Sequence, residues 1–311
     1  MRAIRVDDSD PSRVLLDEAA AQPKPGAGEV LIRVAAAGVT LAELSWYPTS
    51  HQKSGEPRVG AIPGHEFSGL VAAVGKDVGR LAVGHAVFGM NDWYADGAMA
   101  EYCTAPYFAI APKPSRLTLT QAASVPISAL AAWQALFDHA KLHRGETVLI
   151  HGGAGAVGSF AIQFAHLFGA HVTTTAAARD HDFVRHLGAS QVIDYQGSKF
   201  DELVKEMDVV VDTVGGETLA RSWTVLKPEG RIVTLASSEA NSPDPRIKQA
   251  FFTVEPNQKQ LVEIAHLFDA SKLHTTVDSV VPLTEVPDLY TGKVRKPGRG
   301  KLVASIDQVY V

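Results

Sequence analysis

The residues with the clearest chemical potential are three closely spaced glycines. Gly153, Gly155 and Gly158 fit the pattern G-x-G-x-x-G, between the apolar run 148–150 and a stretch with helical periodicity. Glycine suits such a loop because the chain turns tightly and its backbone must approach a pyrophosphate without an intervening Cβ. The helix that follows offers N–H donors and the positive end of its dipole. The pattern predicts a dinucleotide site; a glycine-rich turn without a ligand is the alternative.

The end of the next β-like run distinguishes NADPH from NADH. It reads Thr175-Ala176-Ala177-Ala178-Arg179, where an NAD site has a carboxylate that binds the ribose hydroxyls. Small residues leave room for a 2′-phosphate, and Arg179 can bond to it, although a solvated surface arginine is the alternative. We interpret Asp180 as the N-cap of the following helix. The pattern favours NADPH, with Thr175 and Arg179 at the cofactor.

Alternating elements around these loops predict how they are positioned. The expected strands are 147–151, 171–175, 191–194, 209–213 and 231–236, and the expected helices are 155–168, 180–187, 199–206 and 217–226. Strands and helices that alternate in this way form a doubly wound parallel sheet. A helix over 119–140, with an early break or bend at Pro126, is expected before them.

The rest of the chain is rich in short β-like runs. Before residue 119 these runs are broken by Gly and Pro, which is typical of a partly barrel-like module. After a helix at 258–271, further β-like runs at 277–281 and 301–306 return to that module. The predicted domains are therefore 1–118, completed by 257–311, and 119–256. The fold class is α/β, with a β-rich domain and a doubly wound domain.

Composition and charge exclude several classes of protein. The chain has 311 residues and a net charge of -5, which argues against a binder of nucleic acid. No apolar run approaches the ~20 residues that span a bilayer, and the first residues lack a signal-peptide core. A single cysteine, Cys103, cannot form an internal disulfide. We expect a cytoplasmic protein without a membrane or nucleic-acid partner.

Four stretches together carry a resemblance to a known family. They are Ile62–Gly69, His151–Gly158, Val209–Gly216 and Phe251–Asn257. Over nearly its whole length the chain resembles the zinc-free quinone oxidoreductases and alkenal/enone reductases of the medium-chain dehydrogenase/reductase superfamily. The resemblance implies a GroES-like catalytic domain, a Rossmann domain, NADPH in the cleft between them, and a homodimer.

The same resemblance assigns cofactor contacts. It places residues along the pyrophosphate (Ala156, Val157), near the 2′-phosphate (Arg179, Tyr195), at the edge of the cofactor (Thr213, Val214, Leu235, Ala236, Ser237) and near the nicotinamide (Phe252, Val254). One position departs from the pattern, because Ala131 stands where relatives often have a threonine that contacts the carboxamide.

Zinc can be tested by counting ligands. Gly64-His65-Glu66 resembles a motif of the zinc alcohol dehydrogenases, in which the histidine binds the metal. A catalytic zinc site needs three protein ligands, but Thr40 stands at the first cysteine position, and residues 125–128 offer no Cys, His or carboxylate. The sequence therefore predicts no metal, with His65 in a local hydrogen bond or lining the pocket.

The reaction implied is hydride transfer from NADPH to a quinone, or to the C=C bond of an α,β-unsaturated carbonyl compound. Negative charge then develops on the substrate oxygen, which needs a hydrogen-bond donor. Relatives have an Asn-Pro-x-Asp pattern in which Asn lies near the substrate, but this chain has Thr40 and Glu43 there. The candidate catalytic residues are Thr40, Tyr47 and His65. A zinc-type alcohol dehydrogenase, a non-catalytic NADPH-binding sensor or structural protein, and an enoyl thioester reductase stay open as alternatives.

Overall fold

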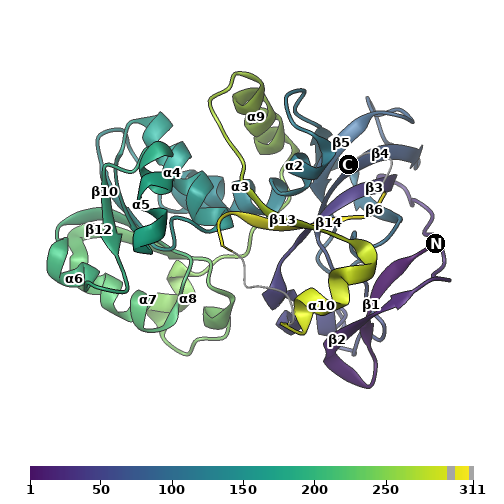
Figure 1. The fold of residues 1–311 in the computed structure, drawn as a ribbon, viewed down its shortest axis with the longest axis horizontal. Coiled ribbons are helices and arrows are strands. Elements are labelled where there is room, and N and C mark those ends of the chain that lie inside the picture. The colour runs from purple at the N-terminus through teal and green to yellow at the C-terminus, as the bar shows by residue number, and fades with distance from the viewer. Residues whose placement is uncertain (293–297, 308–311) are drawn as a thin grey trace. The chain divides into compact units, whose positions relative to one another are not determined.

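The computed structural model describes residues 1–292 and 298–307, except for the side chain of Ser237. The chain forms two compact units (Figure 1). The first, named here the β-rich unit, comprises Met1–Ile127, Pro256–Pro297 and Lys301–Val311. The second, named the Rossmann unit, comprises Ser128–Glu255 with Gly298–Gly300.

The Rossmann unit is built on a five-stranded parallel sheet. Its strands are β8 (Thr147–Ile150), β9 (His171–Ala176), β10 (Gln191–Asp194), β11 (Met207–Asp212) and β12 (Leu226–Thr234). Their order is β10-β9-β8-β11-β12, so the chain first builds outward in one direction and then returns to the other side of β8. This order is that of dinucleotide-binding sheets, whose ligands bind at the carboxyl ends of the strands. The predicted doubly wound sheet is confirmed.

Helices cover both faces of this sheet. They are α4 (Ala156–Phe168), α5 (His181–His186), α6 (Phe200–Leu203), α7 (Gly216–Ser222) and α8 (Pro245–Ala250). Figure 1 shows α4 and α5 on one side and α6, α7 and α8 on the other. Fully buried Leu149 and Val210 of the sheet pack in one apolar cluster with Leu219 of α7. Burial of both faces explains why the central strands are continuous apolar runs.

The β-rich unit is organised around a seven-stranded sheet. Its strands are β3 (Glu29–Val39), β4 (Glu66–Val74), β5 (Ala86–Met90), β6 (Tyr102–Pro106), β7 (Ile110–Pro112), β13 (Val277–Pro282) and β14 (Lys301–Ser305). Along β3, the buried residues Val30, Ile32 and Val34 contribute to the core. β3 pairs with β4, β6 and β14, so the C-terminal segment completes the sheet that the N-terminal segment begins.

Smaller elements surround this sheet. They are the hairpin of β1 (Ala3–Asp7) with β2 (Asp10–Asp17), and the helices α1 (Tyr47–Ser50), α2 (Leu119–Ala123), α3 (Pro126–Trp133), α9 (Gln258–Asp269) and α10 (Val286–Tyr290). The helix α3 begins in the β-rich unit and continues into the Rossmann unit.

Three expectations about this architecture are corrected. The helix predicted over 119–140 is divided at the predicted break into α2 and α3, because Pro126 lacks the N–H that a continuous helix needs, but its last part, Gln134–His139, is π-helical. The helix predicted over 217–226 ends at Ser222, since β12 already begins at Leu226. The first unit extends to Ile127 instead of residue 118, because α2 packs on β3 and β4.

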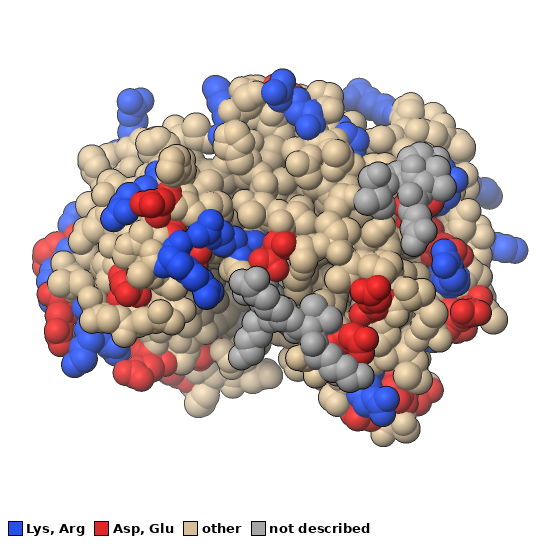
Figure 2. Space-filling view, viewed as in Figure 1, with Lys and Arg blue, Asp and Glu red and all other residues tan. Residues whose placement is uncertain are grey.

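On the face shown in Figure 2, Lys and Arg side chains of the described residues are interspersed with Asp and Glu. Within the described part of the chain, no helix combines the length and apolar character needed to cross a membrane.

Candidate cofactor and substrate sites

The glycine-rich loop joins β8 to α4 and has the shape that a pyrophosphate requires. A Cβ on Gly153 would lie 2.1 Å from Thr174 Oγ1, and one on Gly158 would lie 2.2 Å from the carbonyl oxygen of Gly152. These two glycines therefore let α4 and the loop pack closely. Gly155 is the N-cap of α4, and its Cβ would approach only the Gly152 oxygen, at 3.2 Å. Gly155 is exposed, so its backbone and the helix N-terminus can receive phosphate oxygens. The residues fit a dinucleotide.

Ala156 and Val157 form the first turn of α4, next to Gly155. Their N–H groups lie at the helix end where no intrahelical acceptor exists. The predicted pyrophosphate contacts therefore lie together at the N-terminus of α4.

Thr175, predicted at the cofactor, lies behind this loop. Its side chain is buried, and its hydroxyl oxygen accepts a hydrogen bond from the backbone N–H of Gly152 at 3.2 Å. His151 has both ring nitrogens engaged, with Nδ1 3.2 Å from Thr175 Oγ1 and Nε2 3.0 Å from Ser222 Oγ. Burial lowers the pKa of His151 to about 4. Thr175 and His151 thus support the loop from inside the unit.

This buried histidine predicts a pH-dependent stability of the Rossmann unit. Unfolded His151 titrates near its ordinary pKa of 6.5 and the folded residue near 4, so the unfolded chain binds the extra proton in that window. The stabilisation is present above pH 6.5 and is lost as the pH falls toward 4. Between about pH 7 and 5 the loss is about 2 kcal/mol. We therefore expect the free energy of unfolding, measured with denaturant, to fall by about 2 kcal/mol less in His151→Gln than in the wild type between pH 7 and 5. An unchanged pH dependence in the variant would contradict a neutral, buried His151.

Asp212 organises the loops that follow β11 and β12. Its buried carboxylate accepts hydrogen bonds from the N–H groups of Val214 (3.1 Å) and Gly215 (3.0 Å) and from Thr234 Oγ1 (2.8 Å). Burial raises the pKa of Asp212, and these donors oppose that rise. Thr213 Oγ1 donates to the carbonyl oxygen of His151 at 2.8 Å, which ties this loop to the glycine-rich loop. No role was predicted for Asp212, although it could have been found in the sequence as the carboxylate that directly follows the apolar run 209–211.

The remaining predicted contacts in this unit lie beside the end of β12. The N–H of Leu235 donates to the carbonyl oxygen of Asp212 at 3.0 Å, and that of Ala236 to Thr234 Oγ1 at 3.2 Å. The ring of Phe252 stacks on His139 with centroids 4.0 Å apart. Val214 is half exposed, whereas Val254 is buried. The side chain of Ser237 lies outside the part of the chain that the structure describes.

The carboxyl ends of β9 and β10 bring Arg179 and Tyr195 to adjacent loops. Ala176 pairs with Asp194, so the residues that follow the two strands are neighbours. Both side chains are accessible to a ligand, with exposed fractions of 71% for Arg179 and 60% for Tyr195. This arrangement suits a 2′-phosphate on an adenine ribose.

Asp180 and Arg299 form an ion pair next to Arg179. This pair was not predicted from the sequence. Asp180 occupies the predicted N-cap position of α5, but its side chain makes no capping hydrogen bond. Its Oδ1 accepts instead from Arg299 Nε at 2.6 Å. Arg299 is 119 residues away in sequence, and no local pattern connects the two.

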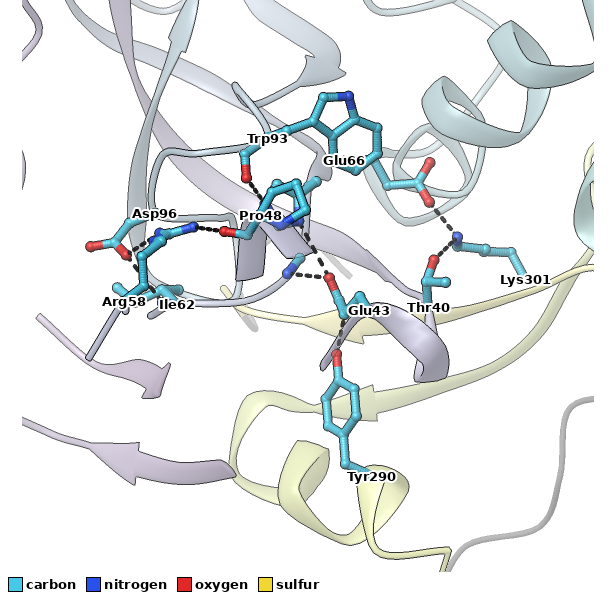
Figure 3. Close-up of polar contacts among 12 residues, drawn as sticks. Thr40, Glu43, Pro48, Arg58, Ile62, Glu66, Trp93, Asp96, Tyr290 and Lys301 are labelled. Atoms are coloured by element: carbon cyan, nitrogen blue, oxygen red, sulfur yellow. Dashed lines mark hydrogen bonds and ion pairs between the residues drawn. The ribbon is translucent and has the colours of Figure 1, made fainter. Parts of the chain in front are cut away.

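The β-rich unit contains a buried polar cluster around Lys301 (Figure 3). Lys301 Nζ lies 2.5 Å from Glu66 Oε1 as an ion pair and donates to Thr40 Oγ1 at 2.7 Å. The second carboxylate oxygen of Glu66 accepts from the backbone N–H of Ile127 at 2.9 Å. Because Lys301 and Glu66 are almost completely buried, their charges balance each other with little help from water. Thr40 is half-buried at the edge of this cluster.

A second set of contacts holds His65. Its Nε2 donates to the carbonyl oxygen of Trp93 at 3.1 Å, and its Nδ1 lies 3.5 Å from Glu43 Oε2. Glu43 also accepts from the backbone N–H of Gly64 (2.7 Å) and from the hydroxyl of Tyr290 (Figure 3). Burial and the Glu43 carboxylate raise the pKa of Tyr290 well above its ordinary value, so the phenol stays protonated as a donor. His65 is only 2% exposed, so it is a buried residue whose ring is fixed by these contacts.

Tyr47, the third catalytic candidate, stands apart from both sets of contacts. Its side chain is 53% exposed, and its ring stacks on His51 with centroids 4.5 Å apart. Of the three candidates, only Thr40 combines partial exposure with a hydrogen bond to a buried charge.

The side chains around His65 do not fit a zinc ion. The His65 Nε2 that would bind a metal is directed to the Trp93 carbonyl, and the Thr40 hydroxyl accepts from an ammonium group. Among the residues that the structure describes, no three His, Cys, Asp or Glu side chains are grouped to hold a metal ion. A catalytic zinc site requires three such ligands.

Comparisons with known proteins identify the family. A family model described as an alcohol dehydrogenase GroES-like domain matches residues 26–115, and one described as a zinc-binding dehydrogenase matches residues 187–303. The mouse protein named "NAD(P)H oxidoreductase RTN4IP1, mitochondrial" is 30% identical, with 89% of this chain and 82% of the relative covered.

Solved structures agree with this result. The quinone oxidoreductase from Coxiella burnetii is 31% identical, with a TM-score of 0.87 and 99% of each chain covered. A mycobacterial protein solved in complex with NADPH is 27% identical, with a TM-score of 0.81 and coverage of 98% of this chain and 100% of that one. The chain belongs to the quinone-oxidoreductase-like family of the medium-chain dehydrogenase/reductase superfamily, with a GroES-like domain and a Rossmann domain.

Proposed function

We propose that this chain is an NADPH-dependent oxidoreductase that transfers hydride, without zinc, to a quinone or to the C=C bond of an α,β-unsaturated carbonyl compound. The observation that carries the proposal is the end of β9, where small residues and the exposed Arg179 accompany a carboxylate, Asp180, that is already paired with Arg299. A similar mycobacterial protein was solved with NADPH, and a similar protein from Coxiella burnetii is a quinone oxidoreductase, which supports both the cofactor and the substrate class.

The chain's own residues supply binding and charge stabilisation. Bound NADPH would supply the hydride, held through its pyrophosphate at Gly155–Val157 and through its 2′-phosphate at Arg179 and Tyr195. As the substrate accepts hydride, negative charge develops on its oxygen and requires a preorganised donor.

Thr40 is the donor that the geometry favours. Its Oγ1 accepts from Lys301 Nζ, so the hydroxyl hydrogen is directed to another acceptor, and the ammonium polarises the O–H bond. His65 and Tyr47 have the weaker claim, because His65 is enclosed and Tyr47 lies outside the polar cluster.

Three alternative functions predict different results in the same test. The zinc-type alcohol dehydrogenase is disfavoured by the engaged Thr40 and His65 side chains. No specific contact favours a non-catalytic NADPH-binding protein or an enoyl thioester reductase. A small-molecule substrate, the absence of nucleic-acid and membrane partners, a homodimer and a cytoplasmic location remain predictions.

The test follows reduced-nicotinamide absorbance with NADPH and NADH against alkenals, cyclic enones, quinones, an enoyl thioester and simple ketones, with and without a chelator. We expect NADPH oxidation by enones or quinones that the chelator leaves unchanged. Activity confined to ketones and abolished by the chelator would contradict the proposal and indicate a metal dehydrogenase. Tight NADPH binding without turnover of any acceptor would indicate a non-catalytic protein.

A further inference from the structure

We propose that Arg299 determines the preference for NADPH by holding the Asp180 carboxylate away from the adenine ribose. The inference rests on the proposed use of NADPH and adds a specificity-determining pair to that site. Asp180 is the first carboxylate after β9, the region where an NAD site places the acid that binds the ribose hydroxyls. In this chain the acid is present, but it is bound to another residue.

The contacts at Asp180 leave little of its charge for a ligand. Its side chain is only 6% exposed. Oδ1 accepts from Arg299 Nε at 2.6 Å, and Oδ2 lies 3.6 Å from Arg179 Nε. Two guanidinium groups therefore surround one carboxylate, and the local charge is positive. A 2′-phosphate would be attracted by this group of three side chains, whereas an unpaired carboxylate would repel it.

Arg299 is itself held in place by two further contacts of its own and by one of the next residue. Its terminal nitrogen donates to the carbonyl oxygen of Arg179 at 2.6 Å, which ties it to the loop after β9. Its guanidinium lies 5.3 Å from the ring centroid of Phe183. The next residue, Gly300, donates its N–H to the carbonyl oxygen of Ala154 at 3.0 Å. The segment Gly298–Gly300 thus connects the pyrophosphate loop to the 2′-phosphate loop, and Arg299 is positioned between two parts of one cofactor site.

Loss of Arg299 changes what Asp180 can do. Without the guanidinium, the more distant Arg179 is the cationic neighbour that the carboxylate keeps among the residues that the structure describes, so it gains freedom to turn toward the ribose. There it would repel a 2′-phosphate and accept hydrogen bonds from the free hydroxyls of NADH. Arg299 therefore favours NADPH through its own charge and through the control of Asp180.

The test measures binding by titrating the fluorescence of NADPH and of NADH, without a substrate. In Arg299→Met, which keeps an unbranched side chain beside Phe183, we expect NADPH affinity to fall by about 10- to 100-fold, the range for a hydrogen bond to a charged group. NADH affinity should stay the same or rise, because NADH lacks the 2′-phosphate and its free ribose hydroxyls can donate to the released Asp180 carboxylate. Adding Asp180→Asn to this variant should restore at least half of the lost NADPH affinity on a logarithmic scale. Adenosine 2′,5′-bisphosphate and AMP should reproduce the difference.

Arg246→Met is the matched control, since Arg246 also pairs with an aspartate (Asp244, 2.8 Å) and lies over an aromatic ring (Trp223, 5.3 Å) in the same unit. It should leave both affinities unchanged. Equal losses for NADPH and NADH in Arg299→Met would overturn the inference, as would a failure of Asp180→Asn to restore binding. Thermal unfolding of each variant shows whether a loss of binding comes from misfolding. If Arg299→Met is unstable, the double variant with Asp180→Asn, in which both charges are removed, is measured in its place. If wild-type protein binds neither nucleotide, the proposed cofactor fails before Arg299 is tested.

Discussion

Replacing Lys301 by methionine should destabilise the β-rich unit by about 3–5 kcal/mol, the cost of leaving a buried charge without its partner. In the native protein, Lys301 Nζ is 2.5 Å from Glu66 Oε1, and the exposed fractions of the two side chains are 8% and 1%. Methionine fills most of the space of the lysine stem, so the loss comes mainly from the charge. Glu66 would keep its hydrogen bond from the Ile127 N–H, but it would lose the ion pair that it makes among the described residues. Chemical denaturation, combined with hydrogen exchange of β3 and β4, measures this loss.

A second substitution separates charge from packing in this experiment. Lys301→Met combined with Glu66→Gln removes both charges and should recover most of the stability, because two neutral partners need no compensation. Lys53→Met is the control in the same unit: Lys53 and Asp92 are 3.5 Å apart and exposed, so the loss should be below about 1 kcal/mol. A loss below about 1 kcal/mol for Lys301→Met as well would contradict a buried ion pair.

Replacing Thr40 by valine should lower kcat/KM for an enone or quinone by about 100-fold, as expected when one donor to a developing oxyanion is removed. Valine has nearly the shape of threonine but cannot donate to the substrate oxygen. The effect should appear mainly in kcat, because the charge on that oxygen develops in the transition state. NADPH affinity should not change, since Thr40 belongs to the β-rich unit and the predicted cofactor contacts belong to the Rossmann unit. Steady-state kinetics and fluorescence titration measure the two quantities.

Two further substitutions make this prediction specific. Thr40→Ser keeps the hydroxyl and should keep activity within about tenfold of the wild type. Tyr47→Phe should change activity by less than about twofold, as is usual for a surface position away from the site, because Tyr47 is exposed and stacked on His51. Full activity in Thr40→Val, or a large loss in Tyr47→Phe, would assign the donor to a different residue.

The Rossmann unit could be predicted well from the sequence because its signals are local. The glycines 153–158 mark one strand-to-helix turn, and the apolar runs of β8 and β11 are buried on both faces. The boundaries were less certain where two elements meet without a break, as at α7 and β12. The hairpin of β1 and β2 was missed because most residues of β2 are exposed or half-buried, which leaves no clear alternation of apolar and polar residues.

The candidate sites were predicted only in part because their support comes from distant segments. Thr40 and His65 could be chosen from sequence, but their partners Lys301 and Glu43 could not, nor could Tyr290, which donates to Glu43. Tyr290 lies 247 residues from Glu43, and only the fold brings α10 to that carboxylate. The pair of Asp180 and Arg299 has the same origin, since the segment Gly298–Gly300 returns to the glycine-rich loop from the far end of the chain. Side chains that position others leave no spacing pattern in the sequence.

The most direct test of the central claim is to follow the hydride itself. Protein shown by elemental analysis to contain far less than one zinc per chain is incubated with NADPH deuterated at C4 of the nicotinamide and with an enone acceptor. The account predicts one deuterium at the β-carbon of the reduced product, found by mass spectrometry and NMR, at a rate that added zinc does not raise. A product without deuterium, or turnover that appears only after stoichiometric zinc is added, would contradict it.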